Sequence, residues 1–398
     1  MANTLILNVD ELWLKGKNRP LYYRAIKEHL AEVLDHYQAG TYRLFSEGQR
    51  FIAVIKEEVE KQGEEGSSFK SVTIEHLLKV PGLHSLATAK RVGLDLAQVV
   101  PALHDFFVGE GKTFKVLTKR ANKKFPLNSV EISQEIGHQI LVNFPQWKVD
   151  VHHPQVLVEL KVMEHNIYVS CQRQKGIGGQ PWGMSGRGVA LLSGGFDSPV
   201  ATYLMLKRGM QLDYAFFYAY PFVGTEVTKK IKELAQVLNQ YQRSATLYIV
   251  PFGDLQQKIA DICRPEYRTV LFRYYMLAAS NLLAEKLGAP ALVTGDALGQ
   301  VSSQTIGNLS LLDRLIPRLI LRPVLGLNKA EIIELAERIN TFAISVRPQD
   351  DACSLLAPRH PIIRPDEAYF TRFVQENPAT NELQNALAKA EKIFFSLV

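Results

Sequence analysis

The sequence predicts an α/β protein whose C-terminal half is a doubly wound parallel sheet. Its expected strands carry no polar alternation and are joined by helices, a pattern typical of a parallel sheet covered on both faces. We expect these strands at 189–192, 212–218, 245–250 and 290–294, and the helices at 197–208, 226–239, 266–287 and 329–339. A stretch with six glycines and one proline, QKGIGGQPWGMSGRG (174–188), marks a domain boundary just before this half.

The N-terminal half combines strands and helices in a less regular order. Residues 4–9 predict a strand, 20–37 a helix with apolar residues at helical spacing, and 50–55 a returning strand. A polar Gly/Ser-rich linker is expected at 61–68. A second unit is expected from about 69 to 170, with helices at 94–107 and 129–143 and strands at 114–118, 156–160 and 166–170.

The composition is that of an ordinary globular protein. With 398 residues, 46% hydrophobic and 22% charged, the chain is neither collagen-like nor largely disordered. Its net charge of +6 permits an anionic partner. No apolar stretch is long enough to span a bilayer and the first residues do not resemble a signal peptide, so we expect a soluble, cytoplasmic protein. Three cysteines, Cys171, Cys263 and Cys353, argue against a disulfide framework or a four-thiolate metal site.

The segment LLSGGFDS (191–198) falls between a buried strand and a helix, where α/β folds bind nucleotides. Gly194 and Gly195 let the backbone turn tightly against a phosphate, and Ser193 and Ser198 add hydroxyl donors. The helix beginning near Asp197 points its free amides at the anion. The alternative is an ordinary strand-to-helix turn. The Lys of a GxxxxGK[ST] loop is missing, which disfavours kinase and GTPase chemistry.

Several motifs resemble one enzyme family. SGGFDS after VALL is similar to the loop of PP-loop ATP pyrophosphatases, and VTGDALGQVSSQT (293–305) resembles a block of the tRNA 4-thiouridine synthetases, also called tRNA uracil 4-sulfurtransferases. KRG (207–209) and LILRPVLGLNKAEII (319–333) are similar to the same family. ELWLKGKNR (11–19) and FKVLTKRANKKFPLNSVEISQEIG (114–137) look like its N-terminal segments. The resemblance implies α+β ferredoxin-like (1–63) and THUMP (64–172) domains before a PP-loop ATP pyrophosphatase domain (173–398).

The resemblance also implies where ATP is bound. Besides the loop residues Ser193, Gly194, Gly195 and Ser198, the expected contacts are Leu191, Leu192, Phe216, Phe217, Arg273, Gly295 and Gln304. Asp197 is expected to hold Mg²⁺ or to orient the pyrophosphate. The alternative is that the four apolar residues belong to the core and that Arg273 is a surface residue. The sequence departs from the family at Tyr218 and Tyr274.

RPQDDACSLLAPRHPIIRP (347–365) resembles the family block that carries a reactive cysteine. Cys353 is therefore expected to carry a persulfide, although a lone cysteine can equally be a small buried apolar residue. The length leaves no room for the C-terminal rhodanese domain of some relatives, so a cysteine desulfurase is the expected sulfur donor. Either Cys171 or Cys263 could serve as the resolving thiol, or neither, and structural roles are favoured for both.

Six basic residues and no acid lie between 111 and 130: Lys112, Lys115, Lys119, Arg120, Lys123 and Lys124. A charge run is usually a solvated face, but this one falls in the THUMP-like region, which grips the acceptor end of tRNA in relatives. Phe114, Phe125 and Trp182 are candidates for base stacking, and Lys15, Lys17 and Arg19 extend the expected surface.

The expected activity is that of a sulfurtransferase. ATP adenylates O4 of uridine-8 in tRNA, and sulfur from Cys353 replaces the AMP to give 4-thiouridine; some relatives also supply sulfur for the thiazole of thiamine. A homodimer is compatible with the sequence. The rivals are another PP-loop enzyme that uses ammonia or lysine, and a non-catalytic RNA-binding module.

Overall fold

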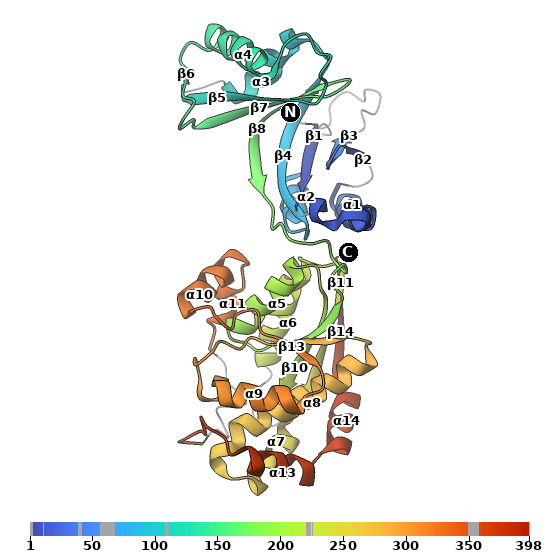
Figure 1. Ribbon diagram of the computed structural model, residues 1–398, viewed down its shortest axis with the longest axis vertical. Helices are drawn as coiled ribbons and strands as arrows, with labels where there is room; N and C mark the ends of the chain where they lie inside the picture. Colours follow the sequence, from blue (N-terminus) through green and yellow to red (C-terminus); the bar gives the residue numbers. More distant parts are fainter. Residues whose placement is uncertain are drawn as a thin grey trace. The chain divides into compact units, whose positions relative to one another are not determined.

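The computed structural model describes residues 3–10, 12–38, 42–55, 68–107, 111–219, 224, 226–348 and 358–397 (Figure 1). The chain divides into two compact units, one ending at Gly179 and the other beginning at Gln180. This division falls inside the glycine-rich stretch 174–188. Residues 61–67 of the expected linker and the whole of 349–357, including Cys353, lie outside the described residues.

The first unit is built on one eight-stranded sheet with the order β2-β3-β1-β4-β8-β7-β5-β6. The strands are β1 (Thr4–Val9), β2 (Tyr42–Glu47), β3 (Arg50–Ile55), β4 (Leu83–Val92), β5 (Thr113–Arg120), β6 (Lys148–Val149), β7 (Val156–Val162) and β8 (Ile167–Lys175). The helices are α1 (Arg19–Gln38), α2 (Ser71–Leu78), α3 (Val99–Phe107) and α4 (Ser129–Asn143), with 3₁₀ turns at Leu12–Asn18 and Leu96–Gln98.

Strand β4 joins the two parts of this sheet, because it pairs with β1 on one side and with β8 on the other. The sequence did not predict β4. Its residues LHSLATAKRV include three small residues, Ser85, Ala87 and Ala89, whose low strand propensity hides the signal. Their small side chains are nonetheless buried between neighbouring strands. The ferredoxin-like and THUMP-like segments therefore share one continuous sheet.

The helix predicted at 129–143 is confirmed at both ends as α4. Asn128 caps it, since its side-chain oxygen accepts hydrogen bonds from the amides of Val130 and Glu131. The Glu131 carboxylate in turn accepts a hydrogen bond from the Asn128 amide. Helices α3 and α4 bury a cluster that includes Phe107, Phe114 and Trp147. Phe114 is fully buried there, so the expectation that it stacks on a base is wrong.

The second unit holds a six-stranded sheet with the order β13-β12-β9-β10-β11-β14. Its strands are β9 (Arg187–Leu191), β10 (Gln211–Tyr218), β11 (Ser244–Pro251), β12 (Ala291–Val293), β13 (Leu319–Leu321) and β14 (Glu391–Ser396). The helices are α5 (Asp197–Lys207), α6 (Glu226–Asn239), α7 (Gly253–Ile262), α8 (Arg268–Lys286), α9 (Ile306–Leu315), α10 (Lys329–Arg338), α11 (Phe342–Ser345), α13 (Glu367–Glu376) and α14 (Thr380–Ala388), with 3₁₀ turns at Pro265–Tyr267 and Ser302–Gln304.

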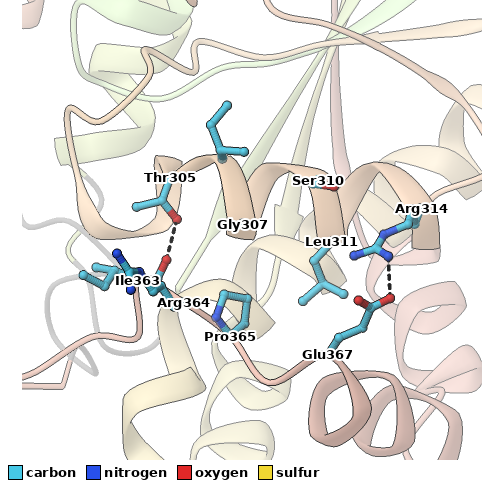
Figure 2. A pocket seen from close by; sticks show the side chains of 10 residues that line it. Thr305, Gly307, Ser310, Leu311, Arg314, Ile363, Arg364, Pro365 and Glu367 are labelled. Carbon is cyan, nitrogen blue, oxygen red and sulfur yellow. Dashed lines mark hydrogen bonds and ion pairs between the residues drawn. The ribbon is translucent and has the colours of Figure 1, made fainter.

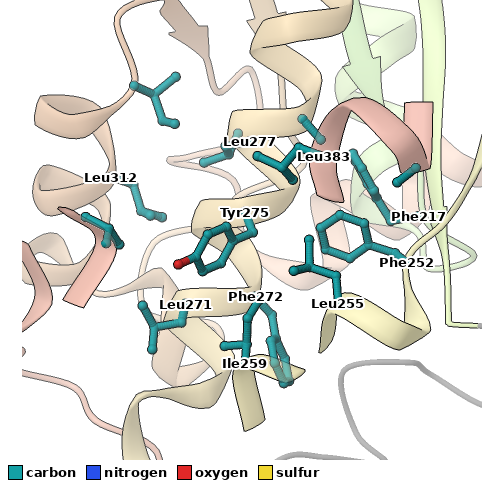
Figure 3. Packing of buried hydrophobic residues seen from close by; sticks show 14 of the residues in the cluster. Phe217, Phe252, Leu255, Ile259, Leu271, Phe272, Tyr275, Leu277, Leu312 and Leu383 are labelled. Carbon is teal, nitrogen blue, oxygen red and sulfur yellow. The ribbon is translucent and has the colours of Figure 1, made fainter. Parts of the chain in front are cut away.

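The doubly wound class predicted for this half is confirmed. Strands β9 to β13 are parallel, and the chain order reverses between β9 and its two neighbours, β10 and β12. Helices α5 and α6 contact one face of the sheet, whereas α7, α8 and α14 bury the other face in a large apolar cluster (Figures 1 and 3). Phe217, Phe252, Leu271 and Tyr275 lie in that cluster (Figure 3).

The sheet is not purely parallel, because β14 runs antiparallel to β11 at one edge. The sequence did not predict this strand. Its residues alternate between exposed and half-buried and carry the charges Glu391 and Lys392, which is the pattern of a half-solvated edge strand. β14 therefore covers the backbone groups of β11 that would otherwise be unpaired.

Candidate active site

The glycine- and serine-rich loop lies at the switch point of the second sheet. It leaves β9 at Leu191 and enters α5 at Asp197, where the neighbours of β9 are β10 on one side and β12 on the other. The Leu192 amide donates to the Ala215 carbonyl at 2.9 Å, which ties the start of the loop to β10. Ligands of open α/β sheets bind at this position, outside the carboxyl ends of the strands.

Two serines fix the shape of the loop. The Ser193 amide donates to Ser198 Oγ at 2.8 Å, and the two hydroxyl oxygens are 3.0 Å apart. The residue at the N-cap of α5 is Phe196, and its side chain makes no capping hydrogen bond. The first amides of an uncapped helix are available to an anion. The loop is thus held closed at its base, and the N-cap residue of its helix offers no side-chain acceptor.

Gly295, which follows β12, contacts the first turn of α5 so closely that no other residue fits. A Cβ atom at Gly295 would lie 2.5 Å from the Ser198 nitrogen and 2.7 Å from the Asp197 carbonyl carbon. The block VTGD therefore packs against the helix end that the phosphate loop presents. The structure brings Gly295 and the loop together.

Asp197 is paired with a lysine that sequence reasoning missed. Lys329 Nζ lies 3.0 Å from Asp197 Oδ1, and the Gln300 side-chain amide donates to Oδ2 at 3.1 Å. Lys329 also lies over the Phe196 ring, 5.1 Å from its centroid. Lys329 belongs to the block 319–333 that carries the family resemblance, and its position at the start of α10 is the signal that could have identified it.

A second group missed from the sequence is Asp296, directly after Gly295. Its buried carboxylate pairs with Arg273 and with Arg322, and accepts a hydrogen bond from the Thr294 hydroxyl at 2.9 Å. Burial acts to raise the pKa of Asp296, but the two guanidinium groups and the Thr294 bond outweigh it, so this pKa lies below the ordinary value. Arg273 is therefore neither a solvated surface residue nor free, because it balances a buried acid.

The four apolar residues expected at the nucleotide do not form one surface. Phe216 and Phe217 are consecutive on β10, so their side chains point to opposite faces of the sheet. Phe217 packs against Phe252 in the core, with ring centroids 4.9 Å apart. Leu191 packs against the same core, while Leu192 is buried at the start of the loop.

Gln304, at the end of the 3₁₀ turn after β12, is buried, and its side-chain oxygen has no hydrogen-bond partner among the described residues. A buried amide oxygen without a partner costs free energy in the ligand-free protein. This residue is therefore ready to accept a hydrogen bond from a bound molecule.

Cys353 lies outside the described residues, but the chain before it and the chain after it are both held by hydrogen bonds. Before it, the Ser345 hydroxyl donates to the Gly195 carbonyl at 3.2 Å. Buried Lys230 donates to the carbonyls of Ser345 and Arg347 at 2.9 and 2.8 Å. After it, the Thr305 hydroxyl donates to the Ile363 carbonyl at 2.8 Å. The described residues before this segment thus contact the phosphate loop, and those after it contact the residue that follows Gln304.

The other two thiols are poor nucleophiles. Burial raises the pKa of Cys171 to about 12, and this residue packs against the core of the first unit. Burial also raises the pKa of Cys263, at the end of α7, despite the nearby Arg268. Both environments disfavour a thiolate.

The donor set at the loop fits magnesium only together with a phosphate ligand. No group of three or more His, Cys, Asp or Glu side chains that could hold a metal occurs in the described part of the chain. Mg²⁺ usually binds through one or two carboxylates and the phosphates of its substrate. Asp197, which pairs with Lys329, is the carboxylate at the loop that would serve in this way.

The six basic residues of 112–124 have different surroundings. Lys112, Lys119, Lys123 and Lys124 are exposed. Arg120 instead donates to the carbonyls of Phe125 and Leu127, both at 2.9 Å, and Lys115 donates to the Val151 carbonyl. Arg120 therefore shapes the loop after β5, and the four exposed lysines remain available to a polyanion.

No helix within the described ranges is long and apolar enough to cross a membrane.

The strand order and the loop at its switch point define an α/β protein of the doubly wound class, in which ligands bind at this position. Comparison with known proteins makes this assignment specific. The family model "Thiamine biosynthesis protein (ThiI)" matches residues 183–377, and the THUMP domain model matches residues 96–172.

Curated relatives extend the match over almost the whole chain. A probable tRNA sulfurtransferase of Thermoanaerobacter pseudethanolicus is 37% identical, over 92% of this chain and 93% of the relative. One of Anoxybacillus flavithermus is 34% identical, over 98% and 96%. A crystal structure of a 4-thiouridine synthetase–RNA complex with bound ATP has a TM-score of 0.86 and 28% identity, covering 100% of both chains. The chain belongs to the tRNA sulfurtransferase family.

Proposed function

We propose that this protein is an ATP-dependent tRNA sulfurtransferase that converts uridine-8 of tRNA to 4-thiouridine. Family membership supports the sulfurtransferase activity, and ATP is the bound nucleotide in the structural relative. The observation that carries the proposal is the convergence of three parts: the loop at the switch point, the block around Gly295, and the two fixed ends of the Cys353 segment.

The first step is adenylation. O4 of the uridine attacks the α-phosphorus of ATP, the bond from that phosphorus to the bridging oxygen breaks, and pyrophosphate leaves. The amides at the start of α5 and the Ser193 hydroxyl stabilise its charge in this proposal. Magnesium, held by Asp197 and the phosphates, would supply further neutralisation. Adenylation turns a poor leaving oxygen into a good one.

The second step is sulfur transfer. The terminal sulfur of a Cys353 persulfide attacks C4 of the uridine, and AMP leaves. A second thiol then cleaves the resulting disulfide, which releases the thiocarbonyl and leaves Cys353 in a disulfide with that thiol. Because the pKa values of Cys171 and Cys263 are both raised by burial, we assign this second thiol to an external reductant.

The partners follow from the same proposal. The sulfur donor is a cysteine desulfurase. The tRNA is held by the exposed lysines at 112–124, which lie within the part of the chain that the THUMP model matches. The boundaries proposed for the domains are 1–63, 64–172 and 173–398. A homodimer, a cytoplasmic location and a link to the thiazole of thiamine belong to this proposal as well.

The test separates the two steps. Purified protein, an unmodified tRNA transcript, ATP, a desulfurase with cysteine and a thiol reductant are combined; pyrophosphate release reports the first step, and 4-thiouridine, measured by mass spectrometry, reports the second. Asp197→Ala should abolish both products. Cys353→Ala should retain pyrophosphate release but lose 4-thiouridine, whereas Cys171→Ala and Cys263→Ala, the matched controls, should retain both. Thiolation by Cys353→Ala with the protein donor would show that this residue is not the sulfur carrier.

A further inference from the structure

A groove outside the nucleotide loop lies between helix α9 and the extended segment 363–367 (Figure 2). Its volume is about 520 Å³, within the usual range for small-ligand sites. Thr305 and Ile306 line it at the start of α9, and Arg314 lies near the end of that helix. Ile363 and Arg364 line it from the other side. None of these side chains has a role in the steps above.

The groove is a built feature, because its two walls are joined by hydrogen bonds. Thr305 caps α9 and donates to the Ile363 carbonyl at 2.8 Å (Figure 2). Asn308, fully buried, donates to the Ile362 carbonyl at 3.0 Å. A Cβ atom on Gly307 would lie 3.3 Å from Pro365 Cδ, so the walls are in close contact at this point. The geometry of the groove is therefore fixed without a ligand.

The chemistry of its surface combines exposed apolar groups with positive charge. Ile306 and Ile363 are 67% and 55% exposed, although both are large aliphatic residues. Arg364 is exposed and has no ion pair among the described residues. Arg314 is held by Glu367 at 2.5 Å, so the groove keeps a net positive charge (Figure 2). Apolar surface beside a free guanidinium suits a nucleobase joined to a phosphate.

The position of the groove links it to the reaction. Its helix wall begins directly after Gln304, whose buried side-chain oxygen has no partner in the described part of the chain. Its other wall is the chain that leaves the Cys353 segment. Any ligand in the groove therefore lies along the two stretches to which the proposed function assigns ATP and sulfur.

We propose that this groove binds the unpaired tRNA nucleotide next to the target uridine. The flanking base contacts Ile306 and Ile363, and the flanking phosphate contacts Arg364. A target base must leave its stack to react, and its neighbours then need a new contact surface. This inference rests on the proposed function and deepens it, because it names residues that position the RNA strand.

Steady-state kinetics test the contacts. Arg364→Ala and Ile306→Ala should each lower kcat/KM for tRNA by about tenfold or more, with the KM for ATP unchanged. The matched controls are Arg372→Ala, an exposed arginine on α13, and Leu319→Ala, which is 62% exposed on β13. If the wild type is active and the kcat/KM for tRNA is the same in the variants as in the controls, the inference is overturned. A wild type that forms no 4-thiouridine would instead overturn the proposed function.

Photo-cross-linking provides a readout that a loss of stability would not imitate. A synthetic tRNA with 4-thiouridine one nucleotide before or after the target is bound to the wild-type protein and irradiated with long-wavelength ultraviolet light. Cross-links should map to peptides within 302–314 or 358–367. Cross-links confined to other peptides would contradict the proposal. A change of oligomeric state in Ile306→Ala, with tRNA kinetics unchanged, would assign the groove to a second copy of the chain.

Discussion

Asp296 shows how much of the site depends on a single buried charge. Its carboxylate neutralises Arg273 and Arg322 and is anchored by Thr294, directly after the glycine that contacts the phosphate loop. A buried ion pair of this kind is costly to break, because removal of one partner leaves an uncompensated charge. Asp296 therefore helps to position Arg273 and Gly295, although it makes no hydrogen bond to the serines of the phosphate loop.

We expect Asp296→Asn to lower the free energy of unfolding at pH 7 by about 3 kcal/mol. The pKa of Asp296 in the folded state lies below its unfolded value of about 3.9, so its stabilisation is present above that pH and is lost as the pH falls through the folded pKa. The difference between wild type and variant should therefore shrink between pH 7 and pH 3. Urea denaturation across this range measures it.

The matched control for this measurement is Asp261→Asn, an exposed carboxylate bonded to Gln257. It should change stability little at any pH. A wild-type advantage over Asp296→Asn that stays constant from pH 7 to pH 3 would contradict the assigned role of this carboxylate.

At the scale of the elements, short segments rather than long helices bring the site together. α11 and the residues after it, up to Arg347, contact the phosphate loop through Ser345 and through the stacked rings of Phe196 and Phe342. Lys230 of α6 fixes this segment by two bonds to its carbonyls. The chain that leads to Cys353 is therefore anchored to a helix far away in the sequence.

Lys230→Met should release this anchor while it keeps the apolar part of the side chain. Because the loop itself is held by Ser193 and Ser198, we expect pyrophosphate release to change less than twofold and 4-thiouridine formation to fall by about tenfold. Single-turnover assays of both products make the comparison. Lys229→Met, an exposed neighbour on the same helix, is the control. An equal loss in both steps would refute the idea that Lys230 acts on sulfur transfer alone.

At the scale of the whole molecule, the residues proposed to bind RNA and those proposed to bind ATP lie in different units. The first unit carries exposed lysines on and around β5, and the second carries the nucleotide loop. The modest net charge of +6 does not reveal the basic surface of the first unit. That surface comes from a local run of basic residues without acids, not from the total charge of the chain. RNA binding and ATP binding should accordingly respond to different substitutions.

The double variant Lys123→Ala/Lys124→Ala should have a less negative slope of log K for tRNA against log salt concentration, by about one to two. The reason is that each phosphate contact releases counterions. Filter binding at several salt concentrations measures the slope, and ATP affinity should stay unchanged. Lys389→Ala, an exposed lysine of the second unit, serves as the control. A slope that is the same in all three proteins would exclude these lysines from the RNA surface.

The sequence by itself determined the class of the second unit, the phosphate loop and the family, because these depend on local patterns: apolar strands, glycines at tight turns, and motif order. It also placed helices α4 and α6 at their observed ends. It missed β4, whose small residues have little strand propensity, and the edge strand β14. Only the tertiary structure decided which charges meet. Asp197 pairs with Lys329, and Asp296 with Arg273 and Arg322, across sequence separations that no periodicity encodes. Long-range pairing depends on how strands and helices pack, and packing is a property of the folded chain.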